Sequence, residues 1–337
     1  MKLPQLDGIG LAEYGMLMDR PVALVVGAAS RDLAAADPRG WRLGGAATYA
    51  SLTLARLGIE VWALIGVDGV AASASELDLL REAGVVLALA ELDSGPVFEN
   101  LETSAGRRQR CLAVADPMAL TTLPRAWTTG FDALVLGPVA GELDGSWALL
   151  AGASPGPYVA LGWQGLLRTL EAGSDVRRIP PVPSALLRRA DLVVASRDDF
   201  APPILPDDLL PFVGSSATLV LTDAEAGGEI LGRATTAASP VHWLRDAYPA
   251  IPTDATIDPT GAGDVFLAAM VAARLVPSLG PASLVAAAAA SLTVEAPGLL
   301  GVPDLGAIRR RMTRAPSLVS LRPSDTSSRT SGRPSQA

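Results

Sequence analysis

Short apolar runs alternate with helical segments through the first third of the chain. The run 22–26 has the composition of a buried strand, and similar runs follow at 61–65 and 85–90. Helical segments over 46–57 and 73–83 separate these runs. Strands and helices that alternate in this way are typical of a mostly parallel sheet covered by helices. The alternation therefore predicts an α/β fold.

One α/β domain is expected to cover most of the chain. A length of 337 residues exceeds that of a usual domain, but α/β folds of this size are often one unit. We place this domain at 20–315, after a loose lead-in over 1–19 and before a tail over 316–337. The tail is rich in Ser, Thr, Pro and Arg and is predicted to be disordered. Further strands are predicted at 132–136, 158–161, 191–195 and 218–222, and a helix at 184–190.

Composition and charge exclude several classes of protein. The net charge of −8 and the pI near 4.8 argue against nucleic acid or an anionic membrane as the main partner. Cys111 is the only cysteine and His242 the only histidine, so an internal disulfide, a cysteine zinc site and a two-histidine metal site are excluded. His242 is interpreted as a surface or packing residue. A metal ion would need oxygen ligands. We find no signal peptide and expect a cytoplasmic protein.

Lysine is almost absent from the sequence. Lys2 is the only one, which excludes a Walker A loop and the ATP site of protein kinases. Schiff-base chemistry is excluded for the same reason, unless Lys2 performs it from the terminus. If the protein binds phosphate groups, backbone N–H groups, arginines and a metal must hold them.

The segment 257–266 combines a glycine-rich turn with a carboxylate. Gly261 and Gly263 allow positive φ and a close approach to a ligand, and a helix is predicted to begin near Asp264. A helix N-terminus attracts anions, and a carboxylate there would repel them. Its presence therefore indicates that it faces a second substrate. Asp264 would take a proton from the hydroxyl of a second substrate as the anion is transferred. The alternative is an ordinary turn in which Asp264 is a first-turn cap.

Asp258-Pro259-Thr260-Gly261-Ala262-Gly263-Asp264 resembles the DTxGAGD signature of the ribokinase-like (PfkB) carbohydrate kinase family. The resemblance implies a three-layer α/β/α sandwich with a small or reduced β-lid. It also implies transfer of the γ-phosphoryl group of ATP, with Mg²⁺, to a hydroxyl of a sugar, a cyclitol such as inositol, or a nucleoside. By position, Gly261, Ala262 and Gly263 would form the anion hole and Asp264 would be the catalytic base. Thr260 is assigned to cofactor binding.

A second resemblance lies near the N-terminus. Gly44-Gly45, followed by Ala50 and Leu57-Gly58, is similar to the family's first signature, in which the asparagine position is here Tyr49. The resemblance assigns Gly44, Gly45 and Tyr49 to substrate binding, together with Asp32 after the first strand. The alternatives are a tight loop for the glycine pair, a packing role for Tyr49 and a solvated loop position for Asp32.

The metal and nucleotide motifs of the family are altered here. Ser196-x-x-Asp199 stands where the family has Asn-x-x-Glu, so the resemblance assigns Asp199 to Mg²⁺, with a water-bridged contact favoured by its shorter arm. The alternative is a helix cap. Thr222 and Gly227 match the family's T-x-G-x-x-G nucleotide loop, whose middle glycine is Ala224 here.

Residues 95–115 interrupt the alternation and predict an antiparallel hairpin with a glycine turn, which would form part of the lid. Only eleven residues separate Asp32 from Gly44, so we expect no room for a second full hairpin there and a reduced lid. Dimerisation through the lid is correspondingly uncertain, and the chain is expected to be a monomer or a homodimer.

Three other functions are considered. A nucleoside kinase is weakly disfavoured because aromatic residues make up only 4% of the chain. A noncatalytic ligand-binding regulator of the same fold is favoured by the altered motifs. An NAD oxidoreductase is disfavoured, since Gly261-x-Gly263-x-x-Phe266 lacks the third glycine of the dinucleotide-binding turn.

Overall fold

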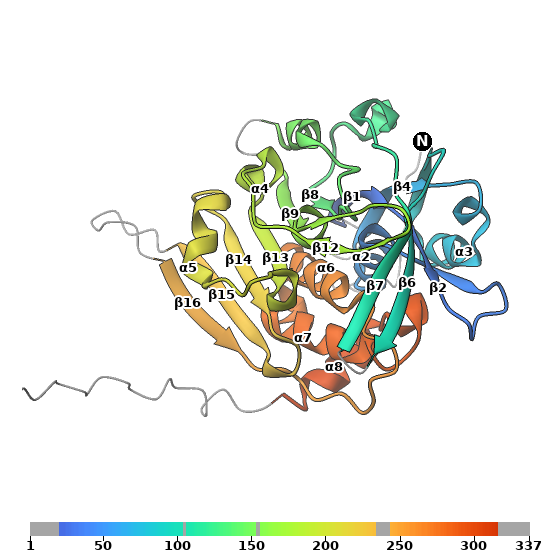
Figure 1. The fold of residues 1–337 in the computed structure, drawn as a ribbon. Helices are drawn as coiled ribbons and strands as arrows, with labels where there is room; N and C mark the ends of the chain where they lie inside the picture. Colours follow the sequence, from blue (N-terminus) through green and yellow to red (C-terminus); the bar gives the residue numbers. More distant parts are fainter. Residues whose placement is uncertain (1–19, 104–105, 153–155, 234–242, 316–337) are drawn as a thin grey trace, which may run out of the picture.

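The computed structural model describes residues 20–103, 106–152, 156–233 and 243–315 (Figure 1). The predicted lead-in (1–19) and tail (316–337) lie outside the described residues, as do Lys2 and His242. None of the helices in the described ranges is long and apolar enough to cross a membrane.

A nine-stranded sheet forms the centre of the molecule. Its order is β16-β15-β14-β13-β9-β8-β1-β4-β5, and the seven strands from β14 to β5 in this order run parallel. The antiparallel strands β15 and β16 extend one edge and were not predicted. The bounds are β1 (Val22–Ala28), β4 (Glu60–Val67), β5 (Val86–Glu91), β8 (Ala133–Leu136), β9 (Tyr158–Gly162), β13 (Leu192–Ser196), β14 (Thr218–Thr222), β15 (Gly228–Arg233) and β16 (Trp243–Tyr248). All seven parallel strands confirm the predicted runs.

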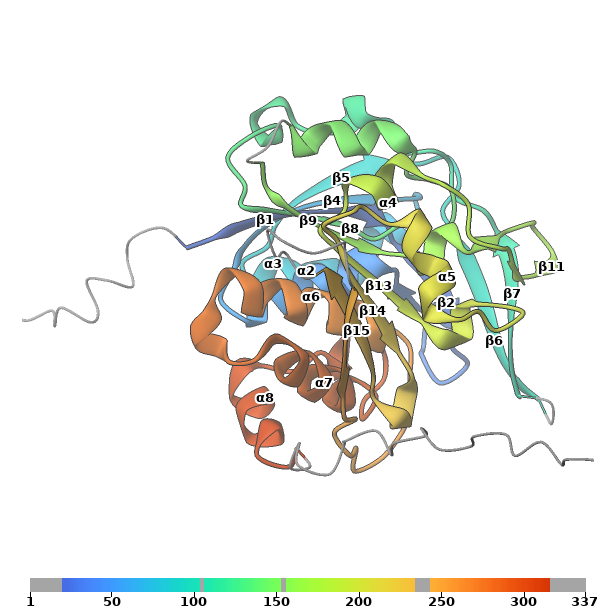
Figure 2. The same ribbon diagram turned by 90° about the vertical axis from the view of Figure 1, so that its left-hand side faces the viewer.

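Helices cover both faces of this sheet (Figure 2). One face carries α2 (Ala46–Arg56), α3 (Ser75–Glu82), α6 (Ala262–Leu275), α7 (Ala282–Thr293) and α8 (Leu305–Met312). The other carries α4 (Ala185–Arg189), α5 (Pro206–Leu209) and short 3₁₀ segments such as η4 (Gly145–Ala151). Each face has its own cluster of buried apolar side chains. The predicted three-layer α/β/α sandwich is confirmed.

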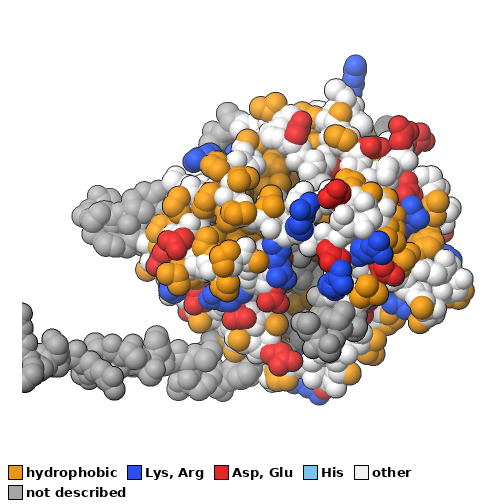
Figure 3. All heavy atoms as spheres, in the orientation of Figure 1, with side chains coloured by type: hydrophobic (Ala, Val, Ile, Leu, Met, Phe, Trp, Pro, Cys, Tyr) orange, Lys and Arg blue, Asp and Glu red, His pale blue; other side chains and the backbone are white. Residues whose placement is uncertain are grey.

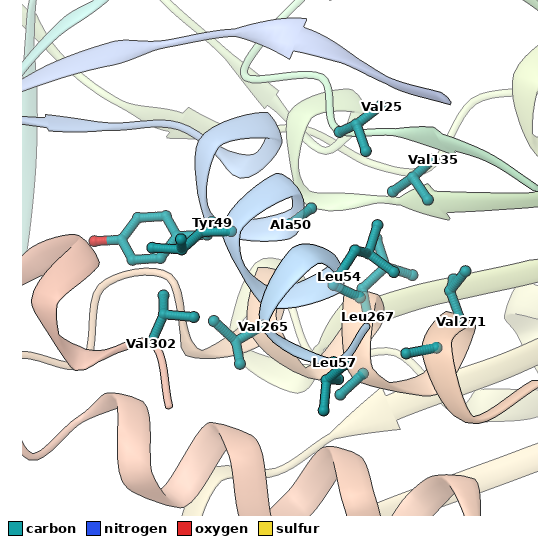
Figure 4. Close-up of a cluster of buried hydrophobic side chains, with 14 of the residues drawn as sticks. Val25, Tyr49, Ala50, Leu54, Leu57, Val135, Val265, Leu267, Val271 and Val302 are labelled. Carbon is teal, nitrogen blue, oxygen red and sulfur yellow. The ribbon is translucent and has the colours of Figure 1, made fainter. Parts of the chain in front are cut away.

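Small aliphatic residues bring the helices of the first face close together. Residues 265–273 of α6 are all buried, so this helix is covered on every side by the sheet, α2 and α7. Alanine adds little bulk and favours the helix, which permits this three-way packing. Figure 4 shows Leu54 of α2 and Leu57, the residue directly after α2, facing Val265 and Leu267 of α6. This packing fixes the start of α6 relative to the start of α2.

A second sheet of five strands, in the order β11-β7-β6-β2-β3, lies beside the carboxyl edge of the central sheet (Figure 1). Its strands are β2 (Ser30–Leu33), β3 (Trp41–Gly44), β6 (Val97–Thr103), β7 (Gly106–Ala113) and β11 (Ser174–Asp175). The pairing of β6 with β7 confirms the hairpin predicted over 95–115. We call these five strands the lid sheet.

The expectation that residues 32–44 leave no room for a hairpin is wrong. Strands β2 and β3 pair in antiparallel register, with Asp32 opposite Arg42 and Ser30 opposite Gly44. The hairpin fits because each strand has only four residues and β2 begins directly after Ala29, with no further connection. Asp32 therefore lies in a strand of the lid sheet and not in a loop.

Candidate active site

The candidate site lies where two helix N-termini meet the carboxyl ends of the parallel strands. Helix α2 begins after Gly45 and helix α6 begins after Gly261, and the two helices pack against each other. The lid sheet covers the same edge, since β2 continues from the end of β1. Ligands of open α/β sheets bind at this edge. The two predicted glycine turns therefore lie where a ligand would bind in such a fold.

The turn before α6 is held by Asp258. Its carboxylate accepts hydrogen bonds from the backbone N–H of Thr260 (3.0 Å) and of Gly298 (3.1 Å), and Arg42 lies 3.8 Å from it. Gly261 then adopts a left-handed conformation (φ 81°), as predicted from the glycine-rich turn. Of the described residues, none has a heavy atom within 4 Å of the position of a Cβ on Gly263. The turn is thus rigid at Asp258 and open at Gly263.

Tyr49 packs against this turn. Its side chain is 1% exposed, and a Cβ on Gly261 would overlap the Tyr49 ring. Figure 4 shows the ring projecting from α2 within the buried cluster. Burial raises the pKa of Tyr49, and the charges of Asp32, Asp258 and Asp264 raise it further. The packing interpretation of Tyr49 therefore accounts for its ring.

Asp32 lies against the glycine pair. Its carboxylate accepts a hydrogen bond from the Ser30 hydroxyl (3.2 Å), and a Cβ on Gly44 would overlap that carboxylate. A Cβ on Gly45 would overlap the Ala28 carbonyl oxygen, and Gly45 has a φ of 101°. Gly45 is therefore required by its positive φ and by the backbone beside it, whereas a side chain at Gly44 would displace the Asp32 carboxylate.

A cavity of about 210 Å³ lies between the lid sheet and the turn. Asp32, Tyr49 and Thr260 line it, whereas Asp264 is not among the lining residues and follows in the first turn of α6. The sequence analysis missed two polar lining residues, Arg42 and Asn100. The alternation along β6 could have identified Asn100, because it lies on the same face of the strand as the buried Phe98. The lining combines these polar groups with the apolar residues Leu33, Leu43 and 34–36.

The carboxyl group of Asp264 is difficult to ionise. Burial raises its pKa, the charges of Asp199 and Asp32 raise it further, and Arg168 opposes them, which leaves the pKa at about 7. The residue keeps partial contact with solvent. A carboxyl group that exchanges its proton near neutral pH has the property required of a general base.

Asp199 caps a 3₁₀ turn. Its carboxylate accepts hydrogen bonds from the backbone N–H of Ser196 (2.8 Å) and from Gln164 Nε2 (2.9 Å), and Ser196 completes a capping box. The capping interpretation is thus present in the structure. Burial raises the pKa of Asp199. No cluster of three or more His, Cys, Asp or Glu residues suited to a metal occurs in the described part of the chain.

The predicted nucleotide residues do not lie together: Thr222 ends β14 beside Ser196, and Gly227 follows the next 3₁₀ turn, whereas Thr260 lines the cavity before α6. Thr222 of β14 pairs with Ser196 of β13. Its hydroxyl donates a hydrogen bond to the Ala195 carbonyl oxygen (3.4 Å). Gly227 has a φ of 88°, and a Cβ there would overlap the Tyr248 carbonyl oxygen. Ala224, at the middle-glycine position, has a positive φ of 41°. Among the described residues it is the one non-glycine residue with a positive φ. A strained backbone of this kind points to a functional loop.

Charges of both signs are mixed on the face shown in Figure 3, where arginines and carboxylates lie side by side. Within the described ranges, arginines form ion pairs with carboxylates, such as Arg39–Glu76 and Arg31–Asp68.

Comparison with known proteins identifies the fold. No family model matches the sequence, and no curated protein sequence matches it. Solved structures do match. A pyrophosphate-dependent kinase in the ribokinase family, complexed with a pyrophosphate analogue and myo-inositol, is 19% identical with a TM-score of 0.63, over 84% of this chain and 100% of that chain.

Two further structures match over nearly their whole length. Ribokinase from Arabidopsis thaliana, complexed with ribose and ATP, is 17% identical with a TM-score of 0.60, over 88% of this chain and 99% of that chain. The nucleoside kinase of Methanocaldococcus jannaschii is 16% identical with a TM-score of 0.58, over 87% and 98%. The chain therefore has the ribokinase-like fold, as the resemblance of its two glycine motifs predicted.

Proposed function

We propose that this protein is a kinase that transfers the γ-phosphoryl group of ATP to a hydroxyl of a small polyhydroxylated substrate, a sugar or a cyclitol such as inositol. The observation that carries the proposal is Asp264. It lies in the first turn of α6, directly after a left-handed glycine, with its pKa raised to about 7. A turn that binds anions and a carboxylate that accepts a proton near neutral pH are the two parts that phosphoryl transfer to an alcohol needs.

The proposed reaction is a direct transfer. The substrate hydroxyl gives its proton to Asp264 as its oxygen forms a bond to the γ-phosphorus. The bond from the γ-phosphorus to the β–γ bridging oxygen breaks, and that oxygen leaves with the electron pair as part of ADP. The first N–H groups of a helix have no partner within the helix. The Ala262 N–H donates to the Pro259 carbonyl oxygen at 3.4 Å, so the Gly263 N–H would be the first to stabilise the charge on the transferring group, and that of Ala262 would add to it by turning from Pro259.

The acceptor would bind in the cavity between the lid sheet and the turn. Asp32 presents a carboxylate that can accept hydrogen bonds from adjacent hydroxyls, and Arg42 and Asn100 add donors to the same lining. Among the described residues that line the cavity, Tyr49 is the one aromatic residue, and its ring is buried against Gly261. This lining suits a polyhydroxylated ring better than a nucleoside base, which would need a stacking surface.

The residues present fit Mg²⁺ only in part. Asp199 supplies one buried carboxylate beside the nucleotide loop, and both of its oxygens already accept hydrogen bonds. Mg²⁺ is often held by one or two carboxylates together with water and substrate phosphates. Asp199 would hold the ion through water, and Mg²⁺ would supply neutralisation of the nucleotide charge. Thr222 and Gly227 would shape the loop that receives the nucleotide.

A second phosphoryl donor, pyrophosphate, is a specific alternative to ATP. A matching structure is that of a pyrophosphate-dependent kinase. In this chain the middle position of the nucleotide loop carries a methyl group on Ala224, where the family resemblance has glycine. The two donors are therefore tested side by side.

The deciding experiment is a turnover screen. We expect acceptor-dependent release of ADP from Mg-ATP, or of phosphate from pyrophosphate, with at least one of a panel of pentoses, hexoses, inositols and nucleosides. Phosphorus NMR of the product identifies the donor and the acceptor position. If no acceptor of the panel is phosphorylated with either donor, the result would support a noncatalytic ligand-binding regulator instead. A cytoplasmic location, a monomeric or homodimeric state and the absence of nucleic-acid and membrane partners stay predictions.

A further inference from the structure

Arg168 contacts the lid sheet that borders the acceptor cavity, although no sequence motif contains it. It belongs to β10 (Arg168–Thr169), which pairs with β12 (Arg177–Arg178) in a small separate hairpin. Its Nε donates to the Val139 carbonyl oxygen (2.7 Å), and its Nη1 donates to Gln109 Oε1 (3.2 Å). Its Cζ lies 5.3 Å from the centre of the Phe98 ring. The loop after β8 and the lid strands β6 and β7 therefore hold the guanidinium in one orientation.

Several carboxylates from separate elements act on this arginine. Burial lowers the pKa of Arg168, and the charges of Asp199, Glu142, Asp264 and Asp32 oppose that effect. Arginine stays protonated under such conditions. Among the described residues, Arg168 is in turn the cation that favours the ionised form of Asp264. The guanidinium thus brings positive charge to a site that is otherwise rich in negative charge.

Two of these carboxylates are committed to other partners. Glu142 accepts hydrogen bonds from the backbone N–H groups of Val139 and Ala140, and Asp199 accepts from Ser196 and Gln164. Within the described residues, two of the five N–H groups of Arg168 have assigned acceptors. A planar guanidinium with remaining donors matches two oxygens of a phosphate. The site therefore has a fixed cation that can receive an anion.

The lid connects this cation with the acceptor cavity. Gln109 accepts from Arg168 through Oε1 and donates through Nε2 to Asn100 Oδ1 (3.1 Å). Asn100 in turn lines the cavity. Because an amide group cannot exchange its donor and acceptor without turning over, this chain of hydrogen bonds fixes the relative positions of cavity and guanidinium.

We propose that Arg168 binds the phosphoryl group during transfer, and that Gln109 and Asn100 position its guanidinium relative to the acceptor. This proposal rests on the proposed kinase function. It also explains how a chain whose only lysine is Lys2 supplies positive charge to the transferring group. Fixed donors aimed at developing charge act mainly in the transition state, so the loss of Arg168 lowers kcat more than it raises KM.

Turnover of three variants tests the role in transfer. Arg168→Ala is expected to lower kcat by about 100- to 1000-fold, with the acceptor KM changed by less than about threefold. Arg168→Lys, which keeps the charge but not the fork, is expected to retain part of the activity. Guanidinium ion added to Arg168→Ala should restore part of the lost kcat. Arg177→Ala is the matched control, since Arg177 lies on the paired strand in an exposed ion pair with Glu171. Its kcat should equal that of the unchanged protein.

Binding of inorganic pyrophosphate tests the anion site without turnover. By isothermal titration calorimetry, Arg168→Ala should bind pyrophosphate at least about tenfold more weakly than the unchanged protein, and Arg177→Ala should bind it equally well. Melting temperatures establish whether each variant is folded. If Arg168→Ala does not fold, the binding of pyrophosphate by Arg168→Lys is the test. Equal binding by the Arg168 variants, or no binding by the unchanged protein, overturns the proposal. Arginine-dependent binding without turnover of any acceptor overturns the kinase function and leaves the anion site standing.

Discussion

The N-termini of α2 and α6 are built by the same backbone device and differ in what surrounds them. Each helix follows a glycine with positive φ, Gly45 at 101° and Gly261 at 81°. Both lie at the carboxyl edge of the central sheet, and the two helices pack together. The first turn of α2 contains no acidic residue, whereas that of α6 contains Asp264.

The surroundings of the two turns explain their proposed tasks. At α2, the Thr48 hydroxyl donates to the carbonyl oxygens of Gly44 and Gly45, and Asp32 lies against Gly44. The Thr48 and Asp32 side chains therefore fill this turn, and the carboxylate beside it belongs to β2 and not to α2. At α6, Gly263 is exposed and the carboxylate is the helix's own. A glycine turn can thus hold a substrate group in place or take part in chemistry, depending on what its neighbours leave open.

Removing the carboxylate of α6 should have the largest effect. Asp264→Asn is expected to lower kcat by about 1000-fold while ATP binding survives, because a general base contributes about 10²- to 10⁴-fold. Steady-state turnover and calorimetric titration with ATP measure the two effects. Asp78→Asn, which changes an exposed first-turn acid of α3, is the control and should leave kcat unchanged. Undiminished turnover of Asp264→Asn would remove Asp264 from the mechanism.

A side chain added to the turn before α6 should cause the next largest effect, a loss of stability. Gly261→Ala places a methyl group in the Tyr49 ring and keeps a residue at positive φ. We expect a loss of about 2 to 5 kcal/mol in the free energy of unfolding, from about 1 to 2 for the left-handed backbone and about 1 to 3 for overpacking. Urea denaturation measures it.

Gly58→Ala is the matched control for this prediction. Gly58 also has positive φ (86°), but no described heavy atom lies within 4 Å of its Cβ position. It should therefore cost only the backbone part, about 1 to 2 kcal/mol. Equal losses for the two variants would show that the packing of Tyr49 on Gly261 contributes nothing.

Changing the carboxylate beside the α2 turn should act on substrate binding. Asp32→Asn keeps the shape of the side chain but replaces two acceptor oxygens by one acceptor and one donor. We expect the KM of the acceptor to rise by about 10- to 100-fold and kcat to fall less, with the KM of ATP unchanged. Initial-rate kinetics with each substrate varied in turn separate these constants. An effect confined to kcat would move Asp32 from the acceptor cavity to the chemistry.

The smallest expected effect is on stability as a function of pH. The pKa of Asp264 rises from its ordinary value of 3.8 to about 7, so the folded state binds this proton more tightly than the unfolded state. Stability from this group therefore falls as the pH rises from about 4 to 7, and the loss is complete above 7. Arg168, Asp199 and Asp32 are the charged groups that act on it.

Asp264→Asn removes this penalty. The variant should be more stable than the unchanged protein at pH 8 by about 1 to 3 kcal/mol, because one pKa unit corresponds to about 1.4 kcal/mol and the residue keeps partial solvent contact. The difference should vanish near pH 4. Urea denaturation at both pH values measures it, and a constant difference would exclude ionisation of Asp264 as its cause.

Much of the fold followed from local patterns. Each predicted parallel strand was found, because a buried strand needs a continuous apolar run and such runs are visible in the sequence. The β2–β3 hairpin was missed because its four-residue strands carry Arg31, Asp32 and Arg42, which do not look like a strand. Strands β15 and β16 were also missed, and their connection, residues 234–242, lies outside the described residues.

The site was predictable in its backbone and less so in its side chains. The positive φ of Gly261 and the start of α6 depend on a few consecutive residues, and both were predicted from them. The packing of Tyr49 on Gly261 was not predicted, since it joins residues on two helices. Arg168 could not have been found, because its bond to Gln109 spans 59 positions and no motif marks either residue.

The sequence by itself determined the parallel α/β architecture, the glycine turns and the carboxylate placed at a helix N-terminus. These features depend on short-range rules of backbone conformation and on the period of apolar residues. Only the tertiary structure decided how that carboxylate ionises and which cation faces it. Burial and charge depend on what surrounds a group in space, and the groups that act on Asp264 come from β2, the turn after β13 and β10.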